Sequence, residues 1–475
     1  MTAMPALPVL APGGVARGPL PRLAGTRAAA VARALVPRTR TLVGGSAGAA
    51  AGVYPGIMPR SMLVEGLAAG VFAVLGVGFA VLVTWLWARM VRRPGGSPGR
   101  SRAGIATAVG CAGAVTAAVA WSAQWARVSA LPVSGGHPSG GYWLGVSAIA
   151  AAVCVTVLGA VRLIRARPRA VAALAVVLVA FGSVSGAAAL DGRPAADPAA
   201  ATTMSTRSGG PGSLIDWDTL GDHGRRFVAD TSHPGAVRAY AGLGSAADVS
   251  ARAALAADDM VRAGGLGRSA VVVMVPTGSG WIDGTAAAGF EELFGGDVAE
   301  VGMQYSSAPS WVSYLFAPDD AAAAAGALIS AVADRIDGLP AAARPDLYVY
   351  GESMGAAAGS RALAEVPRAR EMLCGALWVG PPARFTDPVP ARSSVVVNDS
   401  DPVPNWDPET AVRPAGGATG AAAPPWIPVV SFLQSSVDVI TSRSGPPGTG
   451  HVYGDGQVRG LPACPGPSRT DPSVA

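Results

Sequence analysis

The chain has 475 residues and a formal net charge of +5, yet only 14% of its residues are charged. With a mean hydropathy of +0.37, this composition argues against a single soluble domain and is typical of a protein with several membrane spans. The sequence contains no lysine, and its arginines gather beside apolar runs, which disfavours a nucleic-acid-binding surface.

Apolar stretches dominate the first 190 residues. Four of them reach the length of about 20 residues that a membrane-spanning helix needs, and they occupy 66–87, 103–121, 141–161 and 170–190. A weaker stretch at 41–58 consists mostly of Gly and Ala, and we predict it as a fifth span. The sequence therefore predicts an α-helical multi-span membrane domain over residues 41–190, preceded by an arginine-rich tail over 1–40.

Loop arginines orient this domain. Five arginines lie between positions 89 and 102 and four between 162 and 169, whereas the loop between the second and third strong spans carries only Arg127. By the positive-inside rule, both arginine-rich loops are cytoplasmic and the chain after residue 190 lies outside. Five spans also leave the N-terminal tail, with its six arginines, in the cytoplasm. A cleaved signal peptide is disfavoured, because the first apolar run begins some forty residues into the chain.

The composition changes after residue 190. Residues 191–213 are rich in Pro, Ala, Ser, Thr and Gly, which predicts a linker. Beyond it, short β-branched runs alternate with Ala-rich stretches, so we expect an α/β domain over 214–460 with a mostly parallel sheet and helices on both faces. The expected strands are 237–243, 269–276, 298–305, 346–350, 375–380 and 393–398, and the expected helices are 246–263, 286–294, 319–336 and 354–366. Residues 461–475 are expected to form a disordered tail.

One pentapeptide in this domain carries a chemical signature. Residues 351–355 read Gly-Glu-Ser-Met-Gly and match the GxSxG pattern. Residues 44–48 match it too, but only the later match follows an expected strand and opens an expected helix, as a nucleophile elbow requires. We therefore predict Ser353 as a nucleophile, against the plainer alternative of a small residue in a Gly-rich turn. We interpret Ser46 as part of a membrane helix that packs through small residues.

A serine nucleophile needs an acid and a base, which follow it in that order in α/β-hydrolases. His451 is the only histidine after Ser353 and is the predicted base, in a flexible Gly-rich loop. Asp401, just beyond the expected strand 393–398, is the preferred acid, and Asp399 is the runner-up. Two later aspartates are expected at the surface or as helix caps: Asp407 and Asp438.

An oxyanion hole needs two N–H donors aimed at one point. Met354, directly after the nucleophile, is expected to supply one of them. The other comes from an earlier strand-end loop, and the stretch Pro-Thr-Gly-Ser-Gly-Trp at 276–281 is the obvious source, through Thr277 or Gly278. An ordinary tight turn is the alternative. The loop is not a phosphate loop, because no Gly-Lys-Ser or Gly-Lys-Thr follows it.

The four cysteines fall into two classes. Cys111 and Cys154 lie in apolar runs, where a thiol acts as a small hydrophobe. Cys374 and Cys464 are the only cysteines of the predicted outer domain, where oxidation is permitted, so we hypothesise a disulfide between them. The alternative is a buried free Cys374 and an unpaired Cys464. Since no Cys/His cluster has metal-ligand spacing, we predict no metal site.

Several further stretches combine with the elbow into a family pattern. They are residues 276–281, Met-Gln-Tyr-Ser at 303–306 with Pro-Ser-Trp at 309–311, Ala-Leu-Trp-Val-Gly-Pro-Pro at 376–382, and Ser-Asp-Pro-Val at 400–403 with Trp406. Together with Met-Pro-Arg-Ser at 58–61, they resemble the actinobacterial membrane-anchored α/β-hydrolase family, which fuses a multi-span N-terminal domain to a hydrolase catalytic domain. The resemblance covers most of residues 40–455.

This resemblance implies a triad of Ser353, Asp401 and His451. The chain departs from the family pattern between Pro382 and Ser393, where members usually carry a longer insert facing the substrate. Specificity therefore does not follow from the resemblance.

The predicted function is that of a membrane-anchored serine hydrolase, without a metal or organic cofactor, whose catalytic domain lies outside the cell membrane. Its expected partner is a lipid or cell-envelope ester. One alternative is a catalytically silent receptor or scaffold with a hydrolase fold. Another is a transporter with an accessory outer domain, disfavoured because the four strong spans contain no acidic residue and Glu65, at an edge, is expected to reach water.

Overall fold

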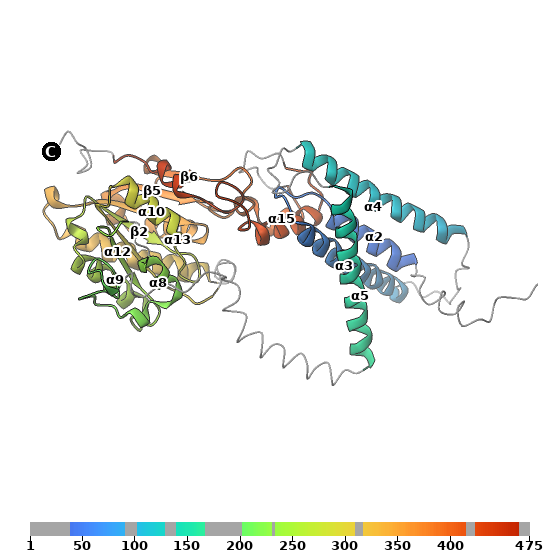
Figure 1. Cartoon of the computed structure of the whole chain (residues 1–475), viewed down its shortest axis with the longest axis horizontal. Helices are drawn as coiled ribbons and strands as arrows, with labels where there is room; N and C mark the ends of the chain where they lie inside the picture. The colour runs from blue at the N-terminus through green and yellow to red at the C-terminus, as the bar shows by residue number, and fades with distance from the viewer. Residues whose placement is uncertain are drawn as a thin grey trace, which may run out of the picture.

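The computed structural model describes residues 39–90, 102–128, 139–166, 202–229, 233–308, 317–414 and 423–464. A group of N-terminal helices lies beside an α/β domain that holds the sheet (Figure 1). Three expected segments lie outside the described residues: the span at 170–190, the first part of the linker at 191–213, and most of the C-terminal tail at 461–475.

Four helices form the described N-terminal part: α2 (Thr39–Gly52), α3 (Met62–Met90), α4 (Arg102–Val128) and α5 (Gly140–Ala166). Two of them, over Met62–Trp87 and Gly140–Ile164, are long and apolar enough to cross a membrane. Large side chains such as Phe79 and Leu144 point outward from them and are 69% and 74% exposed. Such exposed apolar surface is what lipid-facing helices present.

The predicted weak span is shorter than expected. Helix α2 has 14 residues and ends at Gly52, six residues before the expected end at 58. At 1.5 Å per residue it extends over about 21 Å, less than the ~30 Å of a bilayer's hydrocarbon core. It packs closely on α3, because a side chain at Gly44 or Gly48 would collide with the α3 backbone. These two glycines flank Ser46, which agrees with its interpretation as part of a small-residue packing surface.

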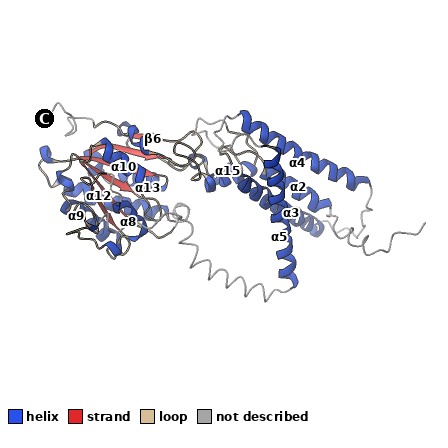
Figure 2. Ribbon diagram, in the orientation of Figure 1, coloured by secondary structure: helices blue, strands red, loops and turns tan. Residues whose placement is uncertain are grey.

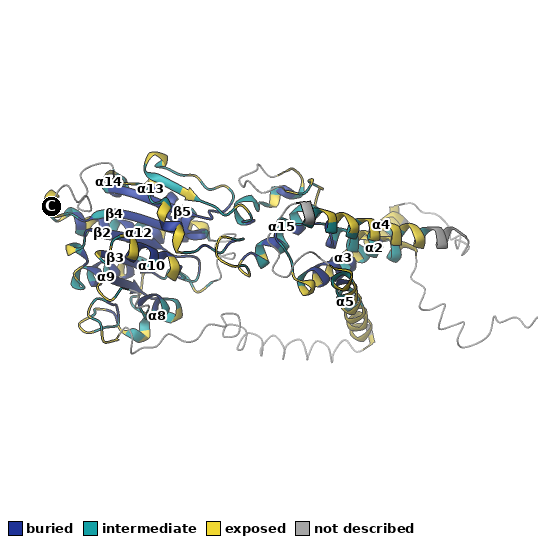
Figure 3. Ribbon diagram, turned by 45° about the horizontal axis from the view of Figure 1, so that its top comes forward, coloured by how far each residue is buried: buried dark blue, intermediate teal, exposed yellow. Residues whose placement is uncertain are grey.

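The α/β domain is built on six strands: β1 (Val237–Ala241), β2 (Ala270–Val275), β3 (Val298–Met303), β4 (Asp346–Glu352), β5 (Leu373–Val379) and β6 (Ser393–Val396). They pair in the order β1-β3-β2-β4-β5-β6, and every pair is parallel. Figure 2 shows the strands in red with helices around them. Strands β1, β2, β3 and β5 are buried along their whole length, so both faces of the sheet are covered (Figure 3). The α/β fold class and all six expected strands are thereby confirmed.

The described α-helices of this part of the chain are α8 (Gly221–Ala229), α9 (Val249–Arg262), α10 (Gly284–Leu293), α12 (Pro318–Asp337), α13 (Met354–Glu365), α14 (Pro367–Met372) and α15 (Val430–Thr441). The four expected helices are α9, α10, α12 and α13. Helices α8, α14 and α15 were not expected from the sequence. Helix α15 stands apart from the sheet and lies beside the N-terminal helices (Figure 1).

The junction between α15 and the N-terminal part corrects two expectations. Asp438, expected at the surface or as a helix cap, is 1% exposed and accepts a hydrogen bond from Arg60 at 2.7 Å. Glu65, expected to reach water, is 4% exposed and lies 3.5 Å from the same arginine. Both carboxylates are buried because a distant part of the chain supplies their partner. Asp407 does cap a helix end, since its side chain accepts from the Glu409 N–H.

The predicted linker is too long. Arg207 and Ser208, inside it, are fully buried against the α/β domain. Arg207 Nη1 donates to the Ala236 carbonyl at 2.9 Å, and the hydroxyl of Ser208 donates to the Asp259 carboxylate at 2.5 Å. These bonds join side chains to partners some thirty to fifty residues away, so composition alone could not reveal them. The α/β domain therefore begins before the expected boundary at 214.

A disulfide joins β5 to the end of the described chain. Cys374 and Cys464 are bonded, with their Cα atoms 4.4 Å apart, so the hypothesised pairing is correct. Cys111 and Cys154 are free.

Candidate active site

The segment around Ser353 has the geometry of a sharp strand-to-helix turn. Strand β4 ends at Glu352, α13 begins at Met354, and Ser353 between them has φ 53° and ψ −120°. A positive φ is strained for a residue with a side chain. Glycines on both sides permit the turn, because a side chain at Gly355 would collide with the Val275 carbonyl and one at Gly351 with the backbone of Gly355. Ser353 is thus held at the carboxyl end of a central strand.

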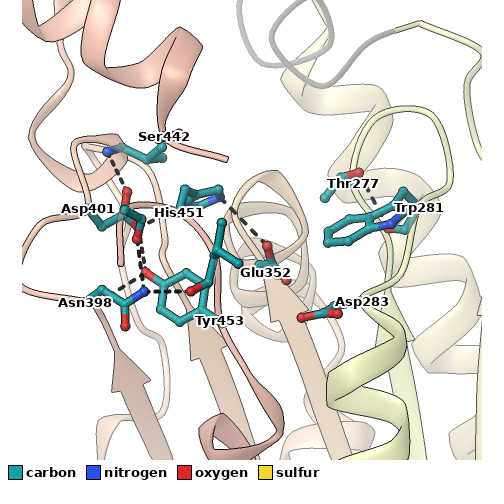
Figure 4. A network of polar contacts seen from close by, with 12 residues as sticks. Thr277, Trp281, Asp283, Glu352, Asn398, Asp401, Ser442, His451 and Tyr453 are labelled. Carbon is teal, nitrogen blue, oxygen red and sulfur yellow. Dashed lines mark hydrogen bonds and ion pairs between the residues drawn. The ribbon is translucent and has the colours of Figure 1, made fainter. Parts of the chain in front are cut away.

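Two predicted residues meet at the same end of the sheet. The distance from His451 Nδ1 to Asp401 Oδ2 is 2.7 Å, and both side chains are buried (Figure 4). The Tyr453 hydroxyl also donates to Asp401 Oδ2, at 2.5 Å, and the Val403 N–H donates to Oδ1 at 2.9 Å. The Asp401 carboxylate is thus held by contacts with three residues. Asp399, the runner-up acid, is exposed, so the geometry favours Asp401.

The other nitrogen of the imidazole has a less expected neighbour. His451 Nε2 is buried and has no hydrogen-bond partner among the described residues. The Glu352 carboxylate lies 3.9 Å from it (Figure 4), and Ser353 Oγ is not hydrogen-bonded to it. Catalytic hydrogen bonds are often long without substrate and tighten in the reacting complex. His451 was expected in a flexible loop, but its backbone is held in place, since the backbone N–H donates to the Ser442 carbonyl at 2.9 Å.

Sequence reasoning missed Glu352 itself, which occupies a variable position of the GxSxG pattern. Its carboxylate is 4% exposed, with Oε2 3.3 Å from the Tyr350 hydroxyl. Burial, followed by repulsion from Asp283, raises the pKa of Glu352 to about 7, although His451 and Arg443 act in the opposite direction. A charged residue at the end of a buried strand was the one signal that could have indicated this site.

Asp283 belongs to the same buried network (Figure 4). Its Oδ2 accepts a hydrogen bond from Gln457 Nε2 at 3.0 Å, and Gln457 Oε1 lies 2.9 Å from the Tyr350 hydroxyl. The network therefore connects Asp283, through Gln457 and Tyr350, with Glu352 beneath the turn.

Thr277 and Gly278 are the two candidates for the oxyanion donor that the loop at 276–281 is expected to supply. The Thr277 N–H donates to the Trp281 carbonyl at 3.0 Å and is therefore engaged within the loop. No such bond engages the Gly278 N–H within the described chain, so the geometry favours Gly278. The predicted second donor, Met354, opens α13. Arg443 lies over the Trp281 ring, 4.2 Å from its centroid.

A cavity of about 600 Å³ lies beside the start of α13. Met354 and Ala357 line it from α13, and Pro382 and Phe385 line it from the segment after β5. An open, largely apolar cavity beside polar groups is the usual form of a small-molecule site.

Comparisons with known families agree with the fold. Residues 237–388 and 383–473 match the model described as the alpha/beta-hydrolase family, and residues 53–190 and 176–231 match the model of that family's N-terminus. The matches cover well over half of the chain, which therefore belongs to this alpha/beta-hydrolase family. No curated protein and no solved structure matches the chain.

Proposed function

We propose that the protein is a membrane-anchored serine hydrolase that cleaves or transfers acyl esters at the outer face of the cytoplasmic membrane. The observation that carries the proposal is the strained Ser353 turn at the carboxyl end of β4, with the buried Asp401–His451 pair at the same end of the sheet. Membership of an alpha/beta-hydrolase family supports hydrolysis in general. The serine mechanism, the ester substrate and the location are the proposed parts.

The reaction follows from these groups. Ser353 Oγ attacks the ester carbonyl while His451 Nε2 takes its proton, and Asp401 holds the Nδ1–H and stabilises the imidazolium. The N–H groups of Met354 and Gly278 stabilise the oxyanion that develops. When the carbonyl re-forms, the alcohol leaves with the proton from His451. Water, or a second alcohol, then attacks the acyl-enzyme by the same route and releases the acid or a new ester.

The proposed substrate is a lipid or cell-envelope ester. Two apolar helices long enough to cross a membrane precede the catalytic domain in the same chain, and tethering raises the effective concentration of a membrane-borne substrate. The largely apolar cavity beside Met354 suits an acyl group. No metal or organic cofactor takes part in the proposed steps.

A covalent probe tests the nucleophile. Full-length wild-type protein is expected to react with a fluorophosphonate probe, and Ser353→Ala is expected to lose the labelling. Ser46→Ala, in the other GxSxG match, serves as the control and should label normally. Equal labelling of wild type and Ser353→Ala would overturn the proposal, and an unreactive wild type would favour a silent scaffold with a hydrolase fold.

The acid is tested by a matched pair of variants. Asp401→Asn should lower kcat on a chromogenic ester by about a thousandfold or more, because the imidazole loses the carboxylate that orients it and stabilises its charge. Asp399→Asn, two residues earlier and exposed, should stay within about twofold of wild type. A larger loss in Asp399→Asn than in Asp401→Asn would reverse the assignment.

A further inference from the structure

Arg60 lies in the segment between α2 and α3 and is buried against α15 of the catalytic domain. Its Nε and Nη2 donate to Asp438 Oδ1 at 3.1 and 2.7 Å, and Nη2 also donates to the Gln434 carbonyl at 3.0 Å. The Ile57 N–H donates to Asp438 Oδ2 at 2.9 Å. The Arg60 and Asp438 side chains are only 3% and 2% exposed. Because losing Arg60 would leave the buried Asp438 carboxylate without its charged partner, this pair holds α15 in one position relative to the segment.

A second contact comes from α15 itself. The side-chain amide of Gln434 donates to the carbonyl oxygens of Ala51 and Gly52 at the end of α2. Positions 434 and 438 are four residues apart and therefore share one face of the helix. One face of α15 is thus bound to both the end of α2 and the segment that leads into α3.

The same segment reaches the loop that carries His451. Met58 is 7% exposed, and a side chain at Gly450 would come within 2.6 Å of its methyl carbon and would also meet the Ser442 carbonyl. Met58 therefore packs against the residue directly before His451. Ser442 follows the last residue of α15, and its carbonyl accepts the His451 N–H at 2.9 Å.

The sheet holds this loop from another direction. Asn398 Nδ2 donates to the Gly450 carbonyl at 2.9 Å, and the Gly450 N–H donates to Ser400 Oγ at 2.8 Å. The backbone at Gly450 is therefore fixed jointly by residues that follow β6 and by residues of the N-terminal part.

We propose that the segment between α2 and α3 is a positioning element for His451. Met58 acts on the loop directly, and Arg60 acts through Asp438 and α15. Among the described residues, no hydrogen bond or ion pair joins either side chain to Ser353 or Asp401, so both are positioning residues rather than catalytic ones. The effect on activity rests on the proposed hydrolase function, whereas the control of the loop does not. Since α3 begins at Met62, the placement of the histidine depends on the N-terminal helices.

Full-length variants test the effect on catalysis. Met58→Ala removes the contact with Gly450 and should lower kcat on a chromogenic ester at least tenfold with KM changed less than about twofold, because a misplacement of about 1 Å can cost on the order of a hundredfold. Met58→Leu should restore most of the rate. Arg60→Met should act in the same direction. Arg335→Met, which breaks the 2.7 Å ion pair with Asp258, is the control and should keep wild-type kcat.

Hydrogen exchange tests the loop without requiring activity. Peptides covering residues 442–453 should exchange faster in Met58→Ala and Arg60→Met than in wild type, and at the wild-type rate in Arg335→Met. Unchanged exchange and unchanged kcat in folded Met58→Ala and Arg60→Met would overturn the proposal. So would a lower Tm with both readouts unchanged, since the segment would then be merely structural. Faster exchange in a chain whose wild type hydrolyses no ester would support the positioning role and reject the proposed function.

Discussion

At the residue scale, some functional side chains can be predicted from a motif, whereas others become visible only from their packing in the structure. Ser353, Asp401 and His451 follow from a pentapeptide and a chain order, and the structure brings the last two within 2.7 Å of each other. No motif or chain order indicated that Glu352, Asp438 and Glu65 would be buried. The ionisation of a carboxylate depends on its burial and on partners that can lie hundreds of residues away, as Arg60 does from Asp438.

The raised pKa of Glu352 predicts a pH-dependent stability. Its pKa rises from an ordinary value of 4.5 to about 7 in the folded protein, so the folded chain keeps a proton that the unfolded chain releases. This contribution is fully present below about pH 4.5 and is lost as the pH rises toward 7. In wild type, the unfolding free energy should therefore fall by up to about 3 kcal/mol between pH 4.5 and 7. Glu352→Gln should not show this fall.

Thermal or denaturant unfolding from pH 4 to pH 8 measures this difference. The curve of Glu352→Gln should be flatter than that of wild type between pH 4.5 and 7. Glu365→Gln, an exposed position on α13, should follow the wild-type curve. Parallel curves for Glu352→Gln and wild type would show that the carboxyl group is not proton-bound in the folded protein.

At the element scale, the sheet and the helices α9, α10, α12 and α13 between its strands were predictable, whereas α8, α14 and α15 were not. Strands such as β2 are continuous apolar runs, which a doubly covered parallel sheet requires. Helices α8 and α14 are short, with 9 and 6 residues, and isolated helices of this length are marginal. α15 gains its support from Arg60, Ala51 and Gly52, and no local pattern encodes such contacts.

The disulfide gives an element-scale prediction. Cys374 on β5 and Cys464 are 90 residues apart in the sequence, so their bond closes a long loop that contains Asp401 and His451. Cys464→Ser should lower the free energy of unfolding by about 3–5 kcal/mol in the chain-entropy account. Cys111→Ser, at a free cysteine, is the matched control. Equal Tm values for Cys464→Ser and wild type, or two free thiols by mass spectrometry of unreduced protein, would contradict this prediction.

At the scale of the whole molecule, the junction gives an argument for orientation that does not depend on the number of spans. Arg60 lies just before α3, and its carbonyl accepts a hydrogen bond from the Tyr142 hydroxyl near the start of α5 at 3.1 Å. The beginnings of both helices therefore lie on the side of the catalytic domain. Their opposite ends carry Arg89 and Arg162 and lead into the two arginine-rich segments of the sequence. By the positive-inside rule we expect those ends to be cytoplasmic and the catalytic domain to lie outside.

Reporter fusions test this orientation. Alkaline phosphatase, which is active only after export, should be active when fused after Ala475 and inactive when inserted after Gly96 between α3 and α4. A fluorescent protein that folds only in the cytoplasm should give the reverse pattern at the same two positions. The expectation rests on two independent features, the arginine bias of the loops and the contact of α15 with the segment before α3. A phosphatase active at Gly96 and inactive at Ala475 would show the opposite orientation and would place the proposed hydrolysis on the cytoplasmic side. The reason is that the junction holds the catalytic domain at the same ends of α3 and α5 in either orientation.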